Sequence, residues 1–173
     1  MSDKTKDAIV SAFLDLASKE KFDKITVTDL AEYCNISRQT FYYHFNDIEE
    51  MIEWTFRNET KKICTVEEDK NWSEYSAMYT ALFNKYDRFF KESLRSANFI
   101  LIYNLINKSF YDYLNFYLEK RSSGMSLGKN KDFFVACLAG AFSSLMIKEI
   151  QKERSNYQEV FESIRAAMQG VAL

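Results

Sequence analysis

Proline is absent from this chain, and glycine occurs only four times in 173 residues. Because these two residues are the strongest helix breakers, their scarcity favours a structure made of helices joined by polar segments. The chain also lacks an uninterrupted apolar run of the roughly 18–20 residues that span a bilayer. Its N-terminus, MSDKTKDAIV, is polar and charged, unlike a signal peptide. We therefore expect an all-α protein that is cytoplasmic and has no membrane partner.

Side chains that bind metals or catalyse reactions are also scarce. Cys34, Cys64 and Cys137 are odd in number and far apart, which argues against a disulfide framework and against a metal motif. His44 is the only histidine, and no Ser–His–Asp arrangement or glycine-rich phosphate loop is present. The sequence predicts that the protein is not an enzyme and uses neither a cofactor nor a metal.

Residues 25–51 have the pattern of two short helices joined by a tight turn and followed by a third helix. Thr26 and Asp29 have the spacing of a helix-capping pair. Asn35 tolerates the left-handed conformation that ends a helix, and Ser37 is a good N-cap for the next one. This is the arrangement of a DNA-binding helix-turn-helix.

The second short helix, residues 38–44, carries hydrogen-bonding side chains around most of its circumference. Arg38 can pair with guanine and Gln39 with adenine, whereas hydroxyl and imidazole groups suit phosphate oxygens. Phe41 and Phe45, four residues apart, can anchor the opposite side. A solvated helix face is the alternative, but the caps and the turn favour DNA binding. We predict DNA contacts from Thr26, Ser37, Arg38, Gln39, Thr40, Tyr42, Tyr43 and His44.

A third helix is predicted to begin at the capping pair Asn46 and Glu49 and to run to about Cys64. It leaves the helix-turn-helix and enters the rest of the chain, so it is the natural mechanical link. We place the domain boundary on this helix, with a DNA-binding domain at residues 1–60 and a helical effector or partner-binding and dimerisation domain at residues 61–173.

The N-terminal region resembles the DNA-binding domain of tetracycline-repressor (TetR) family regulators from about residue 5 to residue 54. The family usually has glycine in the turn where this chain has Asn35, and many members have a phosphate-binding lysine where it has Ile48. The aromatic run at residues 41–45, with residues 52–54, is also similar to a subgroup typified by a dihydroxyacetone-kinase operon regulator. The residues that carry the family resemblance are Ile25-Thr26-Val27, Asp29-Leu30-Ala31, Ile36-Ser37, Thr40-Phe41-Tyr42, His44-Phe45, Asp47 and Glu49.

The charge balance constrains this interpretation. The chain has a net charge of −2, and residues 1–64 contain nine basic and twelve acidic residues. Strong non-specific affinity for nucleic acid is therefore not expected, although the surface that faces phosphates can be locally positive. Candidates for that surface are Lys4, Lys6, Lys24, Arg38 and His44.

The C-terminal half is dense in aromatic residues at helical spacing. They can line a pocket for a small-molecule effector, because tyrosines supply both apolar area and a polar tip. They can equally form an ordinary helical core. If a pocket exists, we expect its lining to include Phe83, Tyr86, Phe99, Tyr103, Phe110 and Tyr113.

The last two predicted helices have features of a dimer interface, because small residues at i, i+4 and i+8 allow another helix to approach closely. Two such helices per chain would form a four-helix interface across a two-fold axis. The alternative is that they complete the chain's own core. The interface residues that we predict are Ala136, Gly140, Ser144, Ile147, Phe161, Ile164 and Met168.

About nine helices are expected in total, with a loop over residues 121–129. The function predicted from these features is a sequence-specific transcriptional regulator that binds a palindromic operator as a homodimer and is controlled by an effector or a protein coregulator. Repression is the commoner outcome in the family; a coactivator-dependent activator and a helical adaptor that does not bind DNA are the alternatives. Besides the helices described above, those that we predict span about residues 4–19, 73–92, 96–104, 107–121, 131–154 and 155–169.

Overall fold

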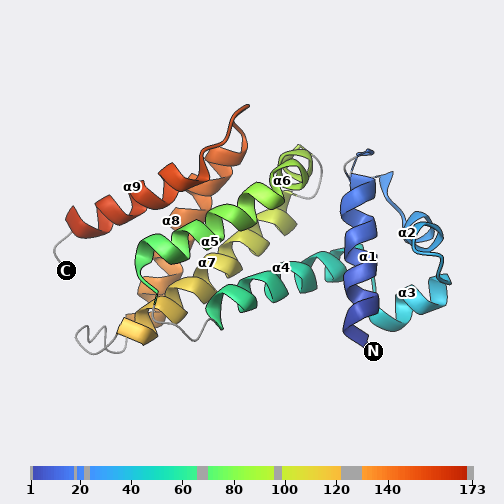
Figure 1. Ribbon diagram of the computed structural model, residues 1–173. Coiled ribbons are helices and arrows are strands. Elements are labelled where there is room, and N and C mark those ends of the chain that lie inside the picture. The colour runs from blue at the N-terminus through green and yellow to red at the C-terminus, as the bar shows by residue number, and fades with distance from the viewer. Residues whose placement is uncertain are drawn as a thin grey trace. The chain divides into compact units, whose positions relative to one another are not determined.

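The structure is a computed structural model that describes residues 2–17, 19–21, 24–65, 70–95, 99–121 and 130–170. These residues form nine α-helices and contain no strand (Figure 1), which confirms the predicted all-α fold. Of the predicted loop over residues 121–129, Arg121 is the last residue of a helix and the rest lies outside the described residues. The helices are α1 (Ser2–Ala17), α2 (Val27–Tyr33), α3 (Arg38–His44), α4 (Ile48–Cys64), α5 (Trp72–Lys85), α6 (Asp87–Leu94), α7 (Phe99–Arg121), α8 (Lys131–Ile150) and α9 (Tyr157–Gly170).

Two predicted helix boundaries in the middle of the chain are wrong. The expected helix over residues 73–92 is divided into α5 and α6, because the backbone leaves helical geometry at Tyr86, with φ −108° and ψ 13°. The two helices expected over residues 96–104 and 107–121 are instead the single helix α7. Neither proline nor glycine separates them, and Leu105 and Ile106 are buried at the expected break, so burial continues along the helix.

The chain divides into two compact units, and the division falls inside α4. The N-terminal unit contains Met1–Asn58 and Arg88–Ile102, and the C-terminal unit contains Glu59–Asp87 and Tyr103–Leu173. The segment at residues 88–102 therefore groups with the N-terminal helices, although the sequence pattern places it in the C-terminal domain.

The N-terminal unit is built around α1, which contacts both α2 and α3 (Figure 1). Ile9 and Phe13 are buried on α1, and the Phe13 ring meets the Phe89 ring of α6 edge-on at 5.8 Å. Phe56 of α4 stacks on the same Phe89 ring, also at 5.8 Å. Because helices of seven residues are not stable alone, their contacts with α1 hold α2 and α3 in position.

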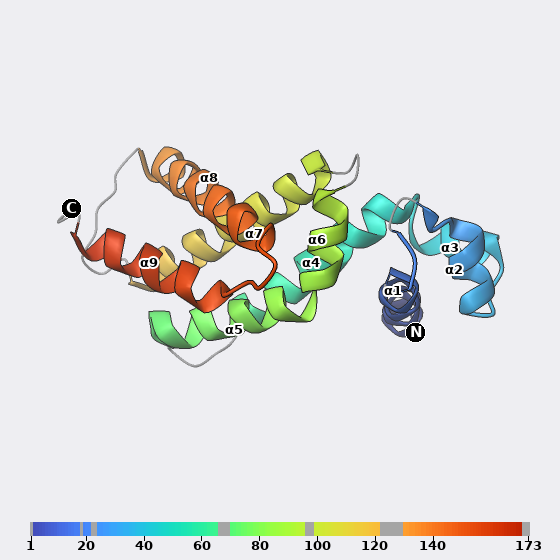
Figure 2. The ribbon, with the colours of Figure 1, turned by 90° about the horizontal axis from the view of Figure 1, so that it is seen from above.

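The C-terminal unit has an aromatic core contributed by α5, α7, α8 and α9. Figure 2 shows α9 beside α5 and α8, in agreement with their contacts. Phe110 of α7 lies at the centre of this core, with the rings of Phe83, Phe142 and Phe161 at 6.0, 5.9 and 5.8 Å. Among the described residues, α8 is long and apolar enough to cross a membrane by length and composition; core helices of soluble proteins often pass the same test.

Candidate nucleic-acid interface

The start of α2 is fixed by the capping pair that the sequence predicts. The Asp29 backbone N–H donates to Thr26 Oγ1 at 3.2 Å, and the Thr26 N–H donates to the Asp29 carboxylate at 2.8 Å. The Thr26 hydroxyl also donates to that carboxylate at 2.6 Å. These hydrogen bonds, the side-chain one first, hold the pKa of Asp29 below its usual value. Since the Thr26 hydroxyl hydrogen is already used, a phosphate contact from this hydroxyl has to replace a bond of the cap.

The turn between α2 and α3 accepts asparagine in place of the family's usual glycine. Asn35 has φ 53°, the only positive φ among the described non-glycine residues. The Ile36 N–H donates to the Ala31 carbonyl at 2.9 Å, and the Asn35 N–H donates to the Glu32 carbonyl at 3.1 Å. This hydrogen-bond pair is a Schellman motif, in which a left-handed residue ends the helix. The turn expected from the sequence is confirmed.

Helix α3 begins at the predicted N-cap. The Thr40 N–H donates to Ser37 Oγ at 3.0 Å, and the two side-chain hydroxyls are 2.8 Å apart. On the inner side of the helix, Phe41 is fully buried, and Phe45, which follows it, is 2% exposed. The Phe45 ring meets that of Trp54 at 5.7 Å. The aromatic anchors thus fix the orientation of α3 and leave its other side toward solvent.

The exposed side of α3 carries most of the predicted DNA contacts. Arg38 and Gln39 are exposed at its first turn. Tyr43 is 83% exposed and Tyr42 47%, which is unusual for large aromatic side chains. The Tyr43 ring meets the half-buried His44 ring edge-on at 5.0 Å. All eight predicted residues therefore lie on α3 or within one residue of the start of α2 or α3, in one compact unit.

The predicted cap at the start of α4 is shifted by one residue. The Glu50 N–H donates to Asp47 Oδ1 at 2.7 Å, and the Asn46 N–H donates to Glu50 Oε2 at 2.7 Å. The capping pair is therefore Asp47 with Glu50, and the expected pair of Asn46 with Glu49 is wrong. Phe45 is extended, with φ −145° and ψ 138°, and α4 begins at Ile48.

The basic residues near α3 differ in what they contact. Lys6 Nζ lies 5.0 Å from the centre of the Phe45 ring and 5.1 Å from that of Trp54, which are cation–π distances. Lys4 and Lys24 are exposed. Lys6 therefore places a positive charge beside the last residue of the helix-turn-helix.

The residues predicted to line an effector pocket are mostly packed in hydrophobic cores. Phe83, Tyr86, Phe110 and Tyr113 are at most 2% exposed, and the rings of Phe110 and Tyr113 each contact Tyr79, at 6.3 and 4.7 Å. Tyr103 is half-buried in the same unit, whereas Phe99 is 43% exposed and belongs to the N-terminal unit. These contacts favour the second explanation of the aromatic pattern, a helical core.

The predicted dimer residues divide into exposed and buried groups. On α8, Ala136 and Ser144 are exposed and Gly140 is half-buried. The side chain of Met168 lies outside the described residues. Phe133 and Leu145, apolar residues of the same helix that the predicted interface does not include, are 74% and 44% exposed on α8. An apolar residue in an apolar helix carries no sequence sign of which way it faces. The predicted residues that are packed inside the chain are Ile147, Phe161 and Ile164, at 7%, 0% and 2% exposure.

Within the described part of the chain, no group of three or more His, Cys, Asp and Glu side chains could hold a metal ion. The site consists of a capped turn and an exposed polar helix, which suits hydrogen bonding to base edges and phosphates in a groove of DNA.

Comparisons with known proteins agree with this geometry. Residues 9–54 match the family model described as bacterial regulatory proteins, tetR family. The HTH-type dhaKLM operon transcriptional activator DhaS of Lactococcus lactis is 26% identical over 158 residues, which cover 87% of this chain and 82% of that protein. An uncharacterized HTH-type transcriptional regulator of Bacillus subtilis, YxbF, is 41% identical over 51 residues, which are 29% of this chain and 13% of that protein.

Solved structures show the same fold. The dihydroxyacetone kinase operon activator DhaS superposes with a TM-score of 0.75 and 19% identity, over 96% of this chain and 94% of that one. The fatty acid degradation regulator FadR from Bacillus halodurans gives a TM-score of 0.63 and 15% identity, over 96% and 95% of the two chains. Both relatives found by sequence are named as HTH-type transcription regulators. Residues 9–54 are therefore a DNA-binding domain of the tetR family, and the chain is a DNA-binding transcription regulator with a helix-turn-helix.

Proposed function

We propose that the protein binds a palindromic operator in the cytoplasm as a homodimer and is controlled through its C-terminal unit. The observation that carries this proposal is the exposed surface of α3, where Arg38, Gln39 and Tyr43 are exposed while Phe41 is buried. In our assignment, Arg38 and Gln39 contact base edges, and the hydroxyl and imidazole groups nearby contact phosphates. One seven-residue helix covers few base pairs, so specificity requires a second copy.

The surface of α8 supports dimerisation. Phe133 and Leu145 are exposed apolar side chains on the same helix as the predicted Ala136, Gly140 and Ser144. A Cβ atom added at Gly140 would meet no atom within 4 Å, so packing within the chain does not require glycine at this position. Close approach by a helix of a second chain is a reason for glycine there.

Replacing this glycine tests the dimer directly. We expect Gly140→Leu to leave the monomer folded, because the site is open and leucine favours helix more than glycine does. The same change should prevent close helix contact and shift the mass measured by light scattering from dimer to monomer. Ala77→Leu, on the exposed side of α5, is the matched control and should leave the mass unchanged. A Gly140→Leu variant that stays dimeric at the same concentration contradicts this interface.

The linking helix α4 provides the route of control. It starts four residues after α3 ends and continues without interruption through the division between the units. We propose that a signal in the C-terminal unit reorients α4 and thereby changes the spacing of the two α3 helices in the dimer. To move the protein from mostly bound to mostly released, the signal must favour one state by about 10⁴-fold, or ~5.5 kcal/mol.

The protein could either activate or repress transcription of its target gene. Repression is the family expectation, but the relative that aligns with 87% of this chain is named as a transcriptional activator. This observation favours activation. A reporter gene fused to the protein's own target promoter distinguishes them, since deletion of the regulator lowers expression if it activates and raises expression if it represses.

Footprinting on DNA from the gene's own upstream region tests the operator model. Two protected half-sites, about 10–10.5 base pairs between centres or a multiple of this, are expected for a two-fold symmetric helix-turn-helix dimer. Protection of one half-site, with no symmetric partner, contradicts the dimeric model.

A further inference from the structure

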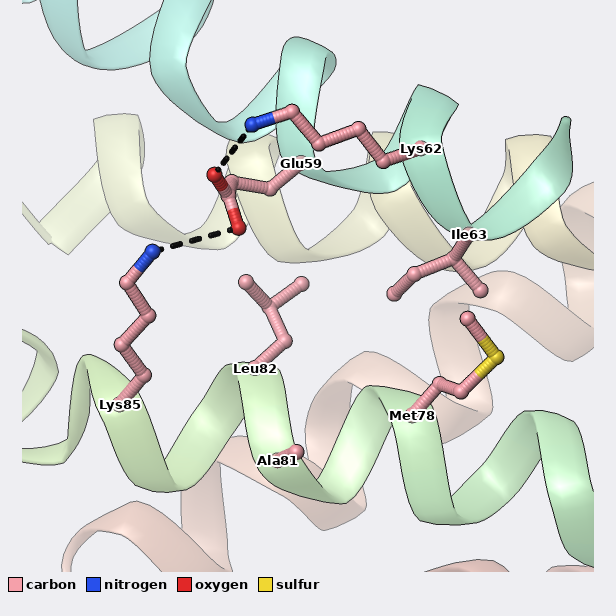
Figure 3. Close-up of a pocket in the computed structure, with 7 residues that line it drawn as sticks. All are labelled: Glu59, Lys62, Ile63, Met78, Ala81, Leu82 and Lys85. Atoms are coloured by element: carbon pink, nitrogen blue, oxygen red, sulfur yellow. Dashed lines mark hydrogen bonds and ion pairs between the residues drawn. The ribbon is translucent and has the colours of Figure 1, made fainter. Parts of the chain in front are cut away.

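A groove with a volume of about 320 Å³ lies between the C-terminal part of α4 and α5, entirely within the C-terminal unit (Figure 3). Ile63 of α4 faces Met78, Ala81 and Leu82 of α5 across it. Ile63 and Leu82 are buried, Met78 is half-buried and Ala81 is exposed, so an apolar floor opens to solvent. The volume falls at the lower end of the ~300–1,000 Å³ typical of small-molecule sites.

The rim of the groove is ionic. Lys62 and Lys85 donate to the two oxygens of the Glu59 carboxylate, at 3.0 and 3.4 Å. Figure 3 shows both ammonium groups directed at this carboxylate from different helices. The lysine side chains are 62% and 53% exposed, whereas that of Glu59 is only 22% exposed. A ligand that approaches from solvent therefore meets two accessible positive charges and one partly covered negative charge.

Lys85 is held in place by a second neighbour. Its Nζ lies 4.9 Å from the centre of the Tyr86 ring, and Tyr86 is buried. Desolvation lowers the pKa of Lys85, but the contact with Tyr86 and the charge of Glu59 outweigh it and raise the pKa overall. Lys85 is therefore cationic at neutral pH and already positioned at the rim. Tyr86, one of the predicted effector residues, therefore contacts this rim through Lys85.

We infer that this groove binds a small amphipathic carboxylate. Its anionic head pairs with Lys62 and Lys85, and its apolar body covers Ile63, Met78 and Leu82. Each ammonium group has three donors. Lys62 uses one for Glu59, and Lys85 uses one for Glu59 and one for Tyr86, so each lysine keeps at least one donor for a second carboxylate. An amphipathic amine of the same size would be repelled by both lysines. A neutral alcohol would gain the apolar contact but not the charge-assisted hydrogen bonds.

The position of the groove gives the ligand a regulatory role, and this part of the inference rests on the proposed function. Glu59, Lys62 and Ile63 belong to α4, the helix that we propose transmits the signal. A ligand that bridges α4 and α5 favours the orientation of α4 in which both sets of contacts are made. It therefore changes operator affinity without touching DNA.

Titration of the full chain with octanoate, well below the concentration at which it forms micelles, tests the binding site. We expect one saturable site per chain by calorimetry and a shift of the Met78 methyl signal in the NMR spectrum, assigned by its loss in Met78→Leu. Octanol and octylammonium should each bind at least tenfold more weakly than octanoate. Absence of saturable octanoate binding, or octylammonium binding as tightly, overturns the inference.

Variants locate the two parts of the site. Lys62→Met with Lys85→Met should weaken octanoate binding at least tenfold, whereas Lys61→Met, an exposed lysine of the same helix that does not line the groove, should not. Ala81→Leu should fill the groove and weaken binding, with Ala77→Leu as its control. Circular dichroism of each variant confirms that the helices are intact. Equal affinity in the double lysine variant and in Lys61→Met overturns the proposed site.

Anisotropy with operator DNA separates the binding site from the regulation. A change in operator affinity of tenfold or more on saturation with octanoate, lost in the double lysine variant, supports both parts. Octanoate binding with unchanged operator affinity overturns the regulatory role only. If specific DNA binding is itself absent, the proposed function fails, and the calorimetric result still decides the binding site.

Discussion

The corner between α8 and α9 depends on one buried carboxylate, and its removal gives a quantitative prediction. The Glu149 side chain is 6% exposed and accepts the Asn156 backbone N–H at 2.7 Å and Lys152 Nζ at 2.6 Å. The Glu149 carbonyl accepts the Ser155 hydroxyl at 3.2 Å. The side chain thus fixes the turn that directs α9 back along the C-terminal unit, where Tyr157 donates a hydrogen bond to Asp87.

Two substitutions at this position separate charge from hydrogen bonding. Glu149→Ala removes the charged acceptor of the part-buried Asn156 N–H, a loss of about 1.5–3 kcal/mol for a hydrogen bond to a charged group. The Lys152 contact adds little, since that lysine is half-exposed. Glu149→Gln retains an acceptor but not the charge, and charged hydrogen bonds are roughly twice as strong as neutral ones. We expect losses in the free energy of unfolding of about 2 kcal/mol for alanine and about 1 kcal/mol for glutamine.

The pH dependence provides an independent check. Burial raises the pKa of Glu149, but the hydrogen bonds from Asn156 and Lys152 outweigh it and leave the pKa below its ordinary value of 4.5. A lowered folded-state pKa means that the carboxylate stabilises the protein fully above about pH 4.5. The stabilisation is lost as the pH falls through the lower folded-state value. The difference between wild type and Glu149→Gln should therefore shrink below pH 4.5.

Urea unfolding followed by circular dichroism measures these differences. Glu162→Ala, at an exposed glutamate of α9 that accepts a hydrogen bond from Gln158 at 3.2 Å, is the control and should change stability by less than ~0.5 kcal/mol. If Glu149→Ala is no worse than Glu162→Ala, or if the glutamine variant loses as much as alanine, the hydrogen-bonding argument is wrong.

Three further predictions concern other local features. Thr60→Val should lower the free energy of unfolding by about 1–3 kcal/mol, because it leaves the buried Ser109 hydroxyl, 2.5 Å away, without this partner. In a double-mutant cycle, adding Ser109→Ala to Thr60→Val should restore part of this free energy. Asn35→Gly should leave the stability unchanged, whereas Asn35→Ala should lower the free energy of unfolding by about 1 kcal/mol, because alanine tolerates φ 53° less well than glycine or asparagine. Equal stability of the two variants contradicts the role of the turn. Burial raises the pKa of Cys64 to about 11, so iodoacetamide at pH 8 should modify it at least ~100-fold more slowly in the native protein than in urea, and similar rates would refute this.

The sequence predicts the helix-turn-helix in detail because its signals are local. The cap at Thr26, the left-handed Asn35 and the cap at Ser37 each depend on residues no more than five positions apart. Where two neighbouring residues can both cap a helix, the sequence does not decide which one does. Asn46 and Asp47 are both good caps, and the structure uses Asp47.

Features that depend on the packing of distant segments could not be predicted in the same way. Helical spacing shows that Phe83 lies on an aromatic face of its helix, and that Phe110 lies on an aromatic face of another. It does not show that these two faces pack against each other to form the core. The ionic rim of the groove joins Glu59 and Lys85, which are 26 positions apart and carry no shared motif. The burial of Phe161 and Ile164 likewise depends on which helices α9 contacts, and the interface role that we predicted for them needs surface that they do not expose.

Fluorescence anisotropy with DNA fragments that tile the upstream region, at two salt concentrations, tests the central claim most directly. The comparison is between wild type and the variant Arg38→Ala with Gln39→Ala, whose side chains are exposed and whose loss should leave the fold intact. We predict that one palindromic fragment binds at least ~10³-fold more tightly than the others and that the variant loses this preference. If all fragments bind alike, with affinity set only by salt and unchanged in the variant, α3 does not recognise DNA sequence and the account is wrong.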